Sequence, residues 1–225
     1  ADAAYKRLTR TVDLTGATSG ELSFWSSYDT ELDWDYMFVE AHPVGSDVWT
    51  TLPDANGHTQ TGTGESCPEG WSELHPFITH YQGPDCEPTG SSGDWNAATG
   101  SSQGWSEWSV DLSDYAGQQV EVSISYVSDW SSQGIGVFLD DVSVLVNGAA
   151  VAETSFETDL GEWTVSGPPE GSAANANDWV RTQLGFEEGA AVLTEDTAYF
   201  GFGLEGLAPG ERDDLLARVM SHLLD

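Results

Sequence analysis

The chain has 225 residues and is strongly acidic, with 38 Asp and Glu against six Lys and Arg and a formal net charge of −32. A charge of this sign repels phosphate backbones and anionic lipids, which argues against nucleic acids and membrane surfaces as partners and favours cations. With 39% hydrophobic residues and ten tryptophans, the chain can still bury a core and is not a disordered acidic tail. A surface adapted to high salt would produce the same excess of acids.

No apolar run is long enough to span a bilayer, and the first residues, ADAAYKRLTR, lack the apolar core of a signal peptide. We therefore expect a mature piece of a protein, without membrane insertion.

Short runs of β-type residues recur along the first two thirds of the chain, between turns rich in Asp, Gly, Ser and Pro. Their spacing predicts an all-β fold, an antiparallel jelly roll or β-sandwich. The expected strands are residues 22–28, 36–42, 48–52, 105–112, 120–127 and 136–146.

An acid-rich segment, YDTELDWDY, separates the first two expected strands. Its spacing imitates an EF-hand loop, but Trp34 stands where that loop requires Gly, and both flanks are expected strands. Carboxylates packed this closely repel one another unless they bind a hard cation. The acids of this segment therefore favour the binding of a hard cation.

Residues 53–104 interrupt the strand pattern with a long loop rich in Gly, Ser, Thr and Pro, which contains both cysteines of the chain. We predict a disulfide between Cys67 and Cys86, which would stabilise the loop and indicate an oxidising, extracellular setting. A pair of free thiols is the alternative.

The sequence WSEWS at residues 105–109 matches the WSxWS motif of cytokine receptors and thrombospondin-type repeats. In those proteins arginines stack on the tryptophans, but here every Lys and Arg is distant along the chain, and no cysteines follow. Period-two alternation instead places Trp108, Val110 and Leu112 on one face of an ordinary half-buried strand.

Asp140 alternates with Val142 and Val144 in the strand expected at 136–146, so its carboxylate is predicted to point into the core. Such an acid must be protonated, paired or bound to metal. Asn147-Gly148 predicts a hairpin, which brings Glu157 close to Asp140 across the partner strand. The pair predicts further ligands for a structural Ca²⁺; solvated acids at strand ends are the alternative.

The chain is expected to divide into a sandwich at residues 1–148 and a C-terminal extension at residues 149–225. The extension begins with the strand that pairs back on the sandwich and ends with an amphipathic helix at 209–224, which has leucines at helical spacing. No histidine opens an HExxH motif and no GxSxG motif occurs, so no zinc site and no catalytic residue are expected in this chain.

Several segments resemble the MAM-like jelly-roll module of the immune inhibitor A group of secreted bacterial metallopeptidases, a module also joined to secreted zinc carboxypeptidases. The resemblance covers nearly the whole chain, but the zinc motif of the peptidases is absent. The segments that carry it are LTRTVDLTGATSGELSFWSSYDTELDWDYMFVEA, GWSEWSVDLSDYAGQQVEVSISYVSD, GIGVFLDDVSV, SFETDLGEWTVSGP, NDWVRT and YFGFGLEGL.

This resemblance implies a calcium-stabilised accessory sandwich beside a catalytic domain. Glu31 and Asp35 match the acids before the second strand of the family, and Asp140 matches the acid of its last strand. Glu157 matches the acid of a Phe-Glu pair that begins related jelly rolls. Here that pair follows the last strand, which implies a permuted sandwich or the start of a second one.

We therefore expect a non-catalytic, extracellular, calcium-binding accessory module of a secreted metallopeptidase. Its expected partner is the catalytic peptidase domain of the same polypeptide, and it would stabilise the enzyme or position a protein or glycan substrate. A carbohydrate-binding module is the alternative, with exposed tryptophans stacking on sugar rings. The candidate residues for this stacking are Trp71, Trp95, Trp105 and Trp130. A self-sufficient enzyme is a third possibility.

Overall fold

The computed structural model describes residues 3–182, 191–193 and 198–200. The chain divides into two compact units, residues 1–181 and 182–225. Two short antiparallel strands of the second unit are described, β10 (Ala191–Leu193) and β11 (Ala198–Phe200). The amphipathic helix expected at 209–224 lies outside the described residues. Within the described part of the chain, no helix is long and apolar enough to cross a membrane.

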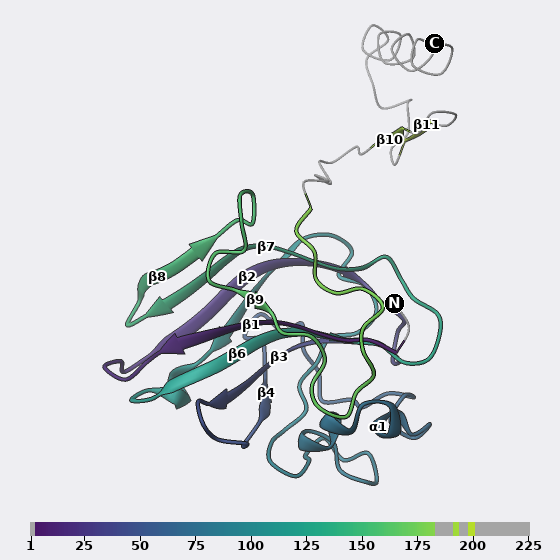
Figure 1. Ribbon diagram of the computed structural model, residues 1–225, viewed down its shortest axis with the longest axis horizontal. Helices are drawn as coiled ribbons and strands as arrows, with labels where there is room; N and C mark the ends of the chain where they lie inside the picture. Colours follow the sequence, from purple (N-terminus) through teal and green to yellow (C-terminus); the bar gives the residue numbers. More distant parts are fainter. Residues whose placement is uncertain (1–2, 183–190, 194–197, 201–225) are drawn as a thin grey trace, which may run out of the picture. The chain divides into compact units, whose positions relative to one another are not determined.

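The first unit is a sandwich of two antiparallel sheets (Figure 1). Sheet A contains, in spatial order, β4 (Thr50–Leu52), β3 (Tyr36–Pro43), β6 (Gln119–Val127), β1 (Tyr5–Asp13) and β9 (Thr164–Val165). Sheet B contains β5 (Ser106–Asp111), β2 (Gly20–Asp29), β7 (Gly136–Val146) and β8 (Ala149–Thr154). From β1 to β3 and from β5 to β7, successive strands alternate between the sheets, as in a jelly roll. The predicted all-β class is confirmed.

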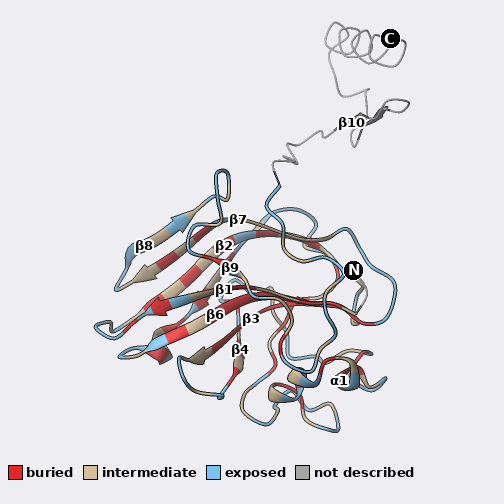
Figure 2. Ribbon diagram, viewed as in Figure 1, coloured by how far each residue is buried: buried red, intermediate tan, exposed pale blue. Residues whose placement is uncertain are grey.

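The main core lies between the two sheets and follows the predicted period-two alternation. In β2, Leu22 and Phe24 are buried while Trp25 is exposed. In β5, Trp108 and Val110 are buried and Glu107 is exposed, so the WSxWS segment is the half-buried strand that the sequence predicts. Buried residues accordingly run along the central strands in Figure 2, whereas β8 has only intermediate and exposed ones.

A second core cluster lies where the 53–104 segment packs on sheet A. This segment contains the helix α1 (Trp71–Leu74) and the 3-10 helix η1 (Pro76–His80). Its aromatic side chains bury Tyr36 and Phe38 of β3, whose alternate residues Met37 and Val39 belong to the main core. Both faces of β3 are therefore covered, which explains why its sequence is a continuous run of buried residues rather than an alternating one.

A buried glutamate links this segment to the sheet. Glu40 of β3 is fully buried and accepts hydrogen bonds from the hydroxyls of Tyr5 (2.7 Å), Tyr81 (2.6 Å) and Ser125 (2.7 Å). The predicted disulfide is also present: Cys67 and Cys86 are joined, with their Cα atoms 5.9 Å apart. Residues 53–104 are therefore a packed part of the sandwich rather than a free loop.

The Asn147-Gly148 turn joins β7 and β8 as a hairpin, with φ of 51° and 75° at its two residues. This geometry confirms the predicted hairpin, because a two-residue turn of this type needs positive φ at both positions. β8 is the fourth strand of sheet B and β9 pairs with β1. Residues 149–181 thus belong to the sandwich unit, and the division between the two units follows residue 181 rather than residue 148.

The free edge of β1 is covered by the segment that contains β9. β9 pairs with Leu8 and Thr9, and the next residue, Ser166, donates its N–H to the carbonyl of Arg7 at 3.1 Å. Further along, the side-chain amide of Asn175 accepts from the Tyr5 N–H and donates to the Tyr5 carbonyl, both at 2.9 Å. A single side chain thus continues the pairing that a strand would provide.

Candidate metal centre

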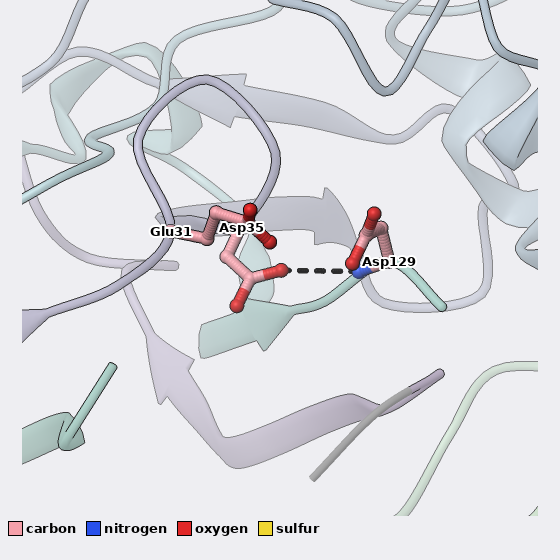
Figure 3. A group of neighbouring side chains, drawn as sticks. All are labelled: Glu31, Asp35 and Asp129. Atoms are coloured by element: carbon pink, nitrogen blue, oxygen red, sulfur yellow. Dashed lines mark hydrogen bonds between the residues drawn. The ribbon is translucent and has the colours of Figure 1, made fainter. Parts of the chain in front are cut away.

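Three carboxylates converge at one end of the sandwich, on the loops that join β2 to β3 and β6 to β7. Glu31, Asp35 and Asp129 each offer an oxygen, and these oxygens all lie within 4.8 Å of one another (Figure 3). Within the described part of the chain, these three carboxylates are the potential ligand groups that lie close enough together to hold a metal ion. The group combines two predicted ligands with one that the sequence reasoning missed.

The β2–β3 loop folds back on itself so that Glu31 and Asp35 lie close together. The carbonyl of Glu31 accepts the N–H groups of Trp34 at 3.2 Å and Asp35 at 2.9 Å. Asp33 between them has φ of 66°, a left-handed conformation that Asp tolerates better than most residues. The alternation of acids in the sequence therefore produces a single turn with two carboxylates in one place.

Asp35 is fully buried and its carboxylate is held in position by two donors. The hydroxyl of Tyr126 donates to Oδ2 at 2.7 Å, and the N–H of Asp129 donates to Oδ1 at 3.1 Å. Burial raises the pKa of the Asp35 carboxyl to about 6, because its loss of solvation outweighs the two hydrogen bonds. The neighbouring charges of Asp129 and Glu31 raise it further.

Among the residues that the structure describes, no cationic side chain pairs with this cluster. Burial and the charge of Asp129 raise the pKa of the Glu31 carboxyl above its usual value. The ion pairs found among the described residues, Arg10–Glu162 and His42–Glu121, lie elsewhere. Three hard oxygen donors without a nitrogen or sulfur ligand suit Ca²⁺ rather than Zn²⁺.

The position of Asp129 follows from strand pairing rather than from a local motif. Tyr36 at the start of β3 pairs with Val127 at the end of β6. The residues just beyond this pair, Asp35 and Ser128, therefore face each other, and Asp129 is next in the chain. An acid that directly follows an expected strand was the available signal, but it becomes informative only once β3 and β6 are known to be neighbours.

Asp140 does not point into the core, which corrects the prediction from alternation. The register of β2 and β7 shifts between Ser23 and Trp25, and Asp141 adopts φ of 47°. This β-bulge inserts one extra residue and reverses the faces of the strand beyond it. Asp140 pairs with the exposed Trp25, whereas Leu139 pairs with the buried Ser26 and packs against the core. Asp140 thus lies on the outer face of sheet B.

Glu157 lies beyond the end of β8, in an exposed bend, and does not join the three-carboxylate cluster. Its backbone carbonyl accepts a hydrogen bond from Arg181 at 2.9 Å. The hairpin forms as predicted, but β8 ends at Thr154, opposite Val142. The strand pairing therefore stops before it would bring Glu157 beside Asp140.

The four tryptophans considered for sugar stacking fall into two groups. Trp71 and Trp95 are fully buried in the second core cluster, so they have no face available for a ligand. Trp105 and Trp130 are 42% and 44% exposed. The prediction that all four could stack on sugar is therefore wrong for the first two, whose burial follows from the packing of the 53–104 segment.

A buried histidine connects that segment to the metal-site loop. Nε2 of His75 lies 2.9 Å from the carbonyl of Ser128, so this nitrogen carries the proton and donates it. Nδ1 then accepts from the hydroxyl of Ser172 at 3.3 Å. Burial lowers the pKa of the His75 imidazole, which favours this neutral form. The residue before Asp129 is thus fixed by the disulfide-containing segment.

Comparison with known proteins identifies two kinds of relative, both distant. The chain is 26% identical over 226 residues to Immune inhibitor A of Bacillus thuringiensis subsp. alesti, an alignment that covers 93% of this chain and 27% of that protein. It is 25% identical over 144 residues to the pre-pro-metalloprotease PrtV of Vibrio cholerae serotype O1, covering 63% of this chain and 12% of that protein. No family model matches the chain.

The resemblance predicted from the sequence motifs is thus confirmed at a coarse level. The chain is weakly similar to Immune inhibitor A and to a bacterial metalloprotease, and it spans about a quarter or less of the length of these relatives. These likenesses are consistent with a part of a larger polypeptide that also contains a peptidase domain.

Proposed function

We propose that this chain is a non-catalytic accessory module of a secreted metallopeptidase, stabilised by Ca²⁺ bound at Glu31, Asp35 and Asp129. The partner of this module is the peptidase domain of the same polypeptide. The module stabilises that domain or supplies it with substrate. The protein is extracellular. The similarity to a metalloprotease and to Immune inhibitor A supports the first part of the proposal.

The observation that carries the calcium proposal is the convergence of three carboxylates that no cationic side chain of the described residues accompanies. Asp35 is fully buried among them, and burial raises its pKa to about 6, so its charged form is less stable there than in water. A divalent cation would supply that charge and connect the β2–β3 and β6–β7 loops. The disulfide Cys67–Cys86 supports an extracellular location, because such bonds persist in oxidising compartments.

Thermal unfolding at pH 7.5 and fixed ionic strength tests this proposal, with EDTA, with Ca²⁺ or with Mg²⁺. A ligand at 100 times its dissociation constant adds about 2.7 kcal/mol to the free energy of unfolding, so we expect Ca²⁺ to raise the midpoint by several degrees. The Asp35→Asn variant should lose this increase, because it removes one charge while Oδ1 can still accept the Asp129 N–H.

The matched control is Asp33→Asn, in the same loop but outside the three-carboxylate cluster. It should retain the response to Ca²⁺. An equal response of wild type and Asp35→Asn, or an increase that any salt produces, would refute the calcium site. The accessory role is tested separately, by deleting this module from the parent protein and measuring the thermal inactivation and peptidase activity of the remainder.

A further inference from the structure

The outer face of sheet B, defined here as the side chains of β5, β2 and β7 that point away from the core, is acidic and contains no basic residue. The strand registers and burial patterns assign these positions. Its acids are Glu21, Asp29, Glu107, Asp111 and Asp140. Four of the other positions on this face are serines, Ser23, Ser27, Ser109 and Ser143, and these small side chains leave the indole of Trp25 accessible between the acids.

Trp25 lies at the centre of this face, between two carboxylates. It pairs with Glu107 on β5 and with Asp140 on β7. Directly opposed residues on one face of a sheet have Cβ atoms about 5 Å apart. The indole is 40% exposed, so a negatively charged group stands on each side of an accessible aromatic ring.

The β-bulge at Asp141 determines which acid stands opposite Trp25. Without it, Asp140 would share the inner face with Val142 and Val144, and Asp141 would pair with Trp25 in its place. The N–H of Asp141 also donates to Oδ1 of Asp140 at 2.8 Å, which fixes the direction of the carboxylate. Bulges of this kind occur where a side chain is re-aimed, frequently beside functional sites.

The described basic residues of the chain have other contacts. Lys6 and Arg7 of β1 lie 5.9 Å from the ring centroids of Tyr126 and Phe77, respectively. Arg10 pairs with Glu162, and Arg181 donates to backbone carbonyls. Trp25 therefore has no cation partner among the described residues, although an indole face flanked by carboxylates attracts ammonium and guanidinium groups strongly.

We propose that the outer face of sheet B binds a basic polypeptide segment, with an Arg or Lys side chain over Trp25 and between Glu107 and Asp140. Charge complementarity selects this occupant. The acids repel anionic glycans, nucleic acids and lipid surfaces, and a net charge of −32 attracts a basic chain over a long range. On β2, Glu21 lies four residues from Trp25, about 14 Å along the strand, which would allow a second cationic side chain to bind.

The test measures binding of a fluorescein-labelled hexa-arginine peptide to the whole chain by fluorescence anisotropy, at low and at physiological salt. We expect Trp25→Ala to weaken binding about fivefold, the size of a partly desolvated cation–π contact. Glu107→Gln and Asp140→Asn should each weaken it by a similar factor. In the Asp140→Asn variant, Oδ1 can still accept the N–H of Asp141. If this variant does not fold, Glu107→Gln still tests the proposal.

Two matched controls separate this site from general attraction to an acidic protein. Trp130→Ala removes a tryptophan of similar exposure elsewhere, and Asp47→Asn removes an exposed charge from the turn between β3 and β4 of the other sheet. Both should change the affinity less than twofold. The same peptide with citrulline in place of arginine should not bind.

Equal losses from Trp25→Ala and Trp130→Ala would overturn the proposal, as would the absence of binding at low salt. A further outcome would also overturn the proposal. If a neutral oligosaccharide such as cellohexaose binds in a way that depends on Trp25, and the peptide does not bind, this face binds glycans. Peptide binding should persist in EDTA, because the three-carboxylate cluster is a different group of residues. Failure of the calcium proposal and failure of this one are therefore distinguishable.

Discussion

At the scale of single residues, the buried carboxyl of Asp35 makes the metal centre sensitive to pH. Its pKa is raised to about 6 because burial removes solvation from the charged form. In the absence of metal, the contribution of this group to stability is fully present below its unfolded pKa of about 3.9 and is lost as the pH rises through 6. Bound Ca²⁺ reverses this preference, because it requires the ionised form.

We therefore predict that the Ca²⁺ affinity falls below pH 6, by about tenfold per pH unit while one proton competes with the metal. The raised pKa of Glu31 makes this decline steeper. Isothermal titration at pH 5, 6, 7 and 8 measures the effect. An affinity independent of pH over this range would mean that Asp35 does not ligate the ion.

The bulge at Asp141 shows how one extra residue in a strand can make a prediction from alternation wrong. Strict alternation places Asp140 on the core face, and no local motif marks the extra residue, since the φ of 47° occurs at an Asp and not at a Gly. The acid-rich segment could be recognised because its carboxylates are close in sequence, and the family resemblance singled out Glu31 and Asp35 within it. Asp129 could not, because its proximity depends on the pairing of β3 with β6.

At the scale of elements, short-range patterns predicted β2 to β8 but missed β1 and the short β9. The alternation of Trp108 and Val110 and the Asn147-Gly148 turn each determine local structure within a few residues. Segment 53–104 was different: its Gly- and Pro-rich composition predicts a loop, yet Trp71 and Trp95 form a second core against sheet A. Composition does not report the packing of tryptophans that are far apart in sequence.

The disulfide between Cys67 and Cys86 stabilises this second core, and we predict a measurable loss without it. Closing a loop with a sequence separation of 19 should contribute about 3 kcal/mol through the unfolded state. Urea unfolding of a Cys67→Ser, Cys86→Ser double variant, compared with wild type, measures the difference. Reduction of the wild type should give the same loss. A change below about 1 kcal/mol would show that the packing around Trp71 holds the segment by itself.

At the scale of the whole molecule, residues 1–181 contain two core clusters and both sheets of the sandwich. We predict that a chain ending at residue 181 unfolds cooperatively, with a midpoint within about 3 °C of the full chain, a difference of less than about 1 kcal/mol. A chain ending at residue 148 should not fold cooperatively, because it lacks β8, β9 and the buried Trp163. Circular dichroism melts of both chains check this, and equal stability of the two would contradict it.

The segment that pairs with the edge of β1 also affects whether copies of this chain associate through their strands. An uncovered strand edge presents a row of N–H and carbonyl groups, which is a template for edge-to-edge aggregation. β9 and the amide of Asn175 occupy those groups on β1. On the opposite sheet, β8 has an irregular register and the exposed Glu153, two features that discourage strand addition. The last third of the sandwich thus protects one edge of each sheet against strand addition.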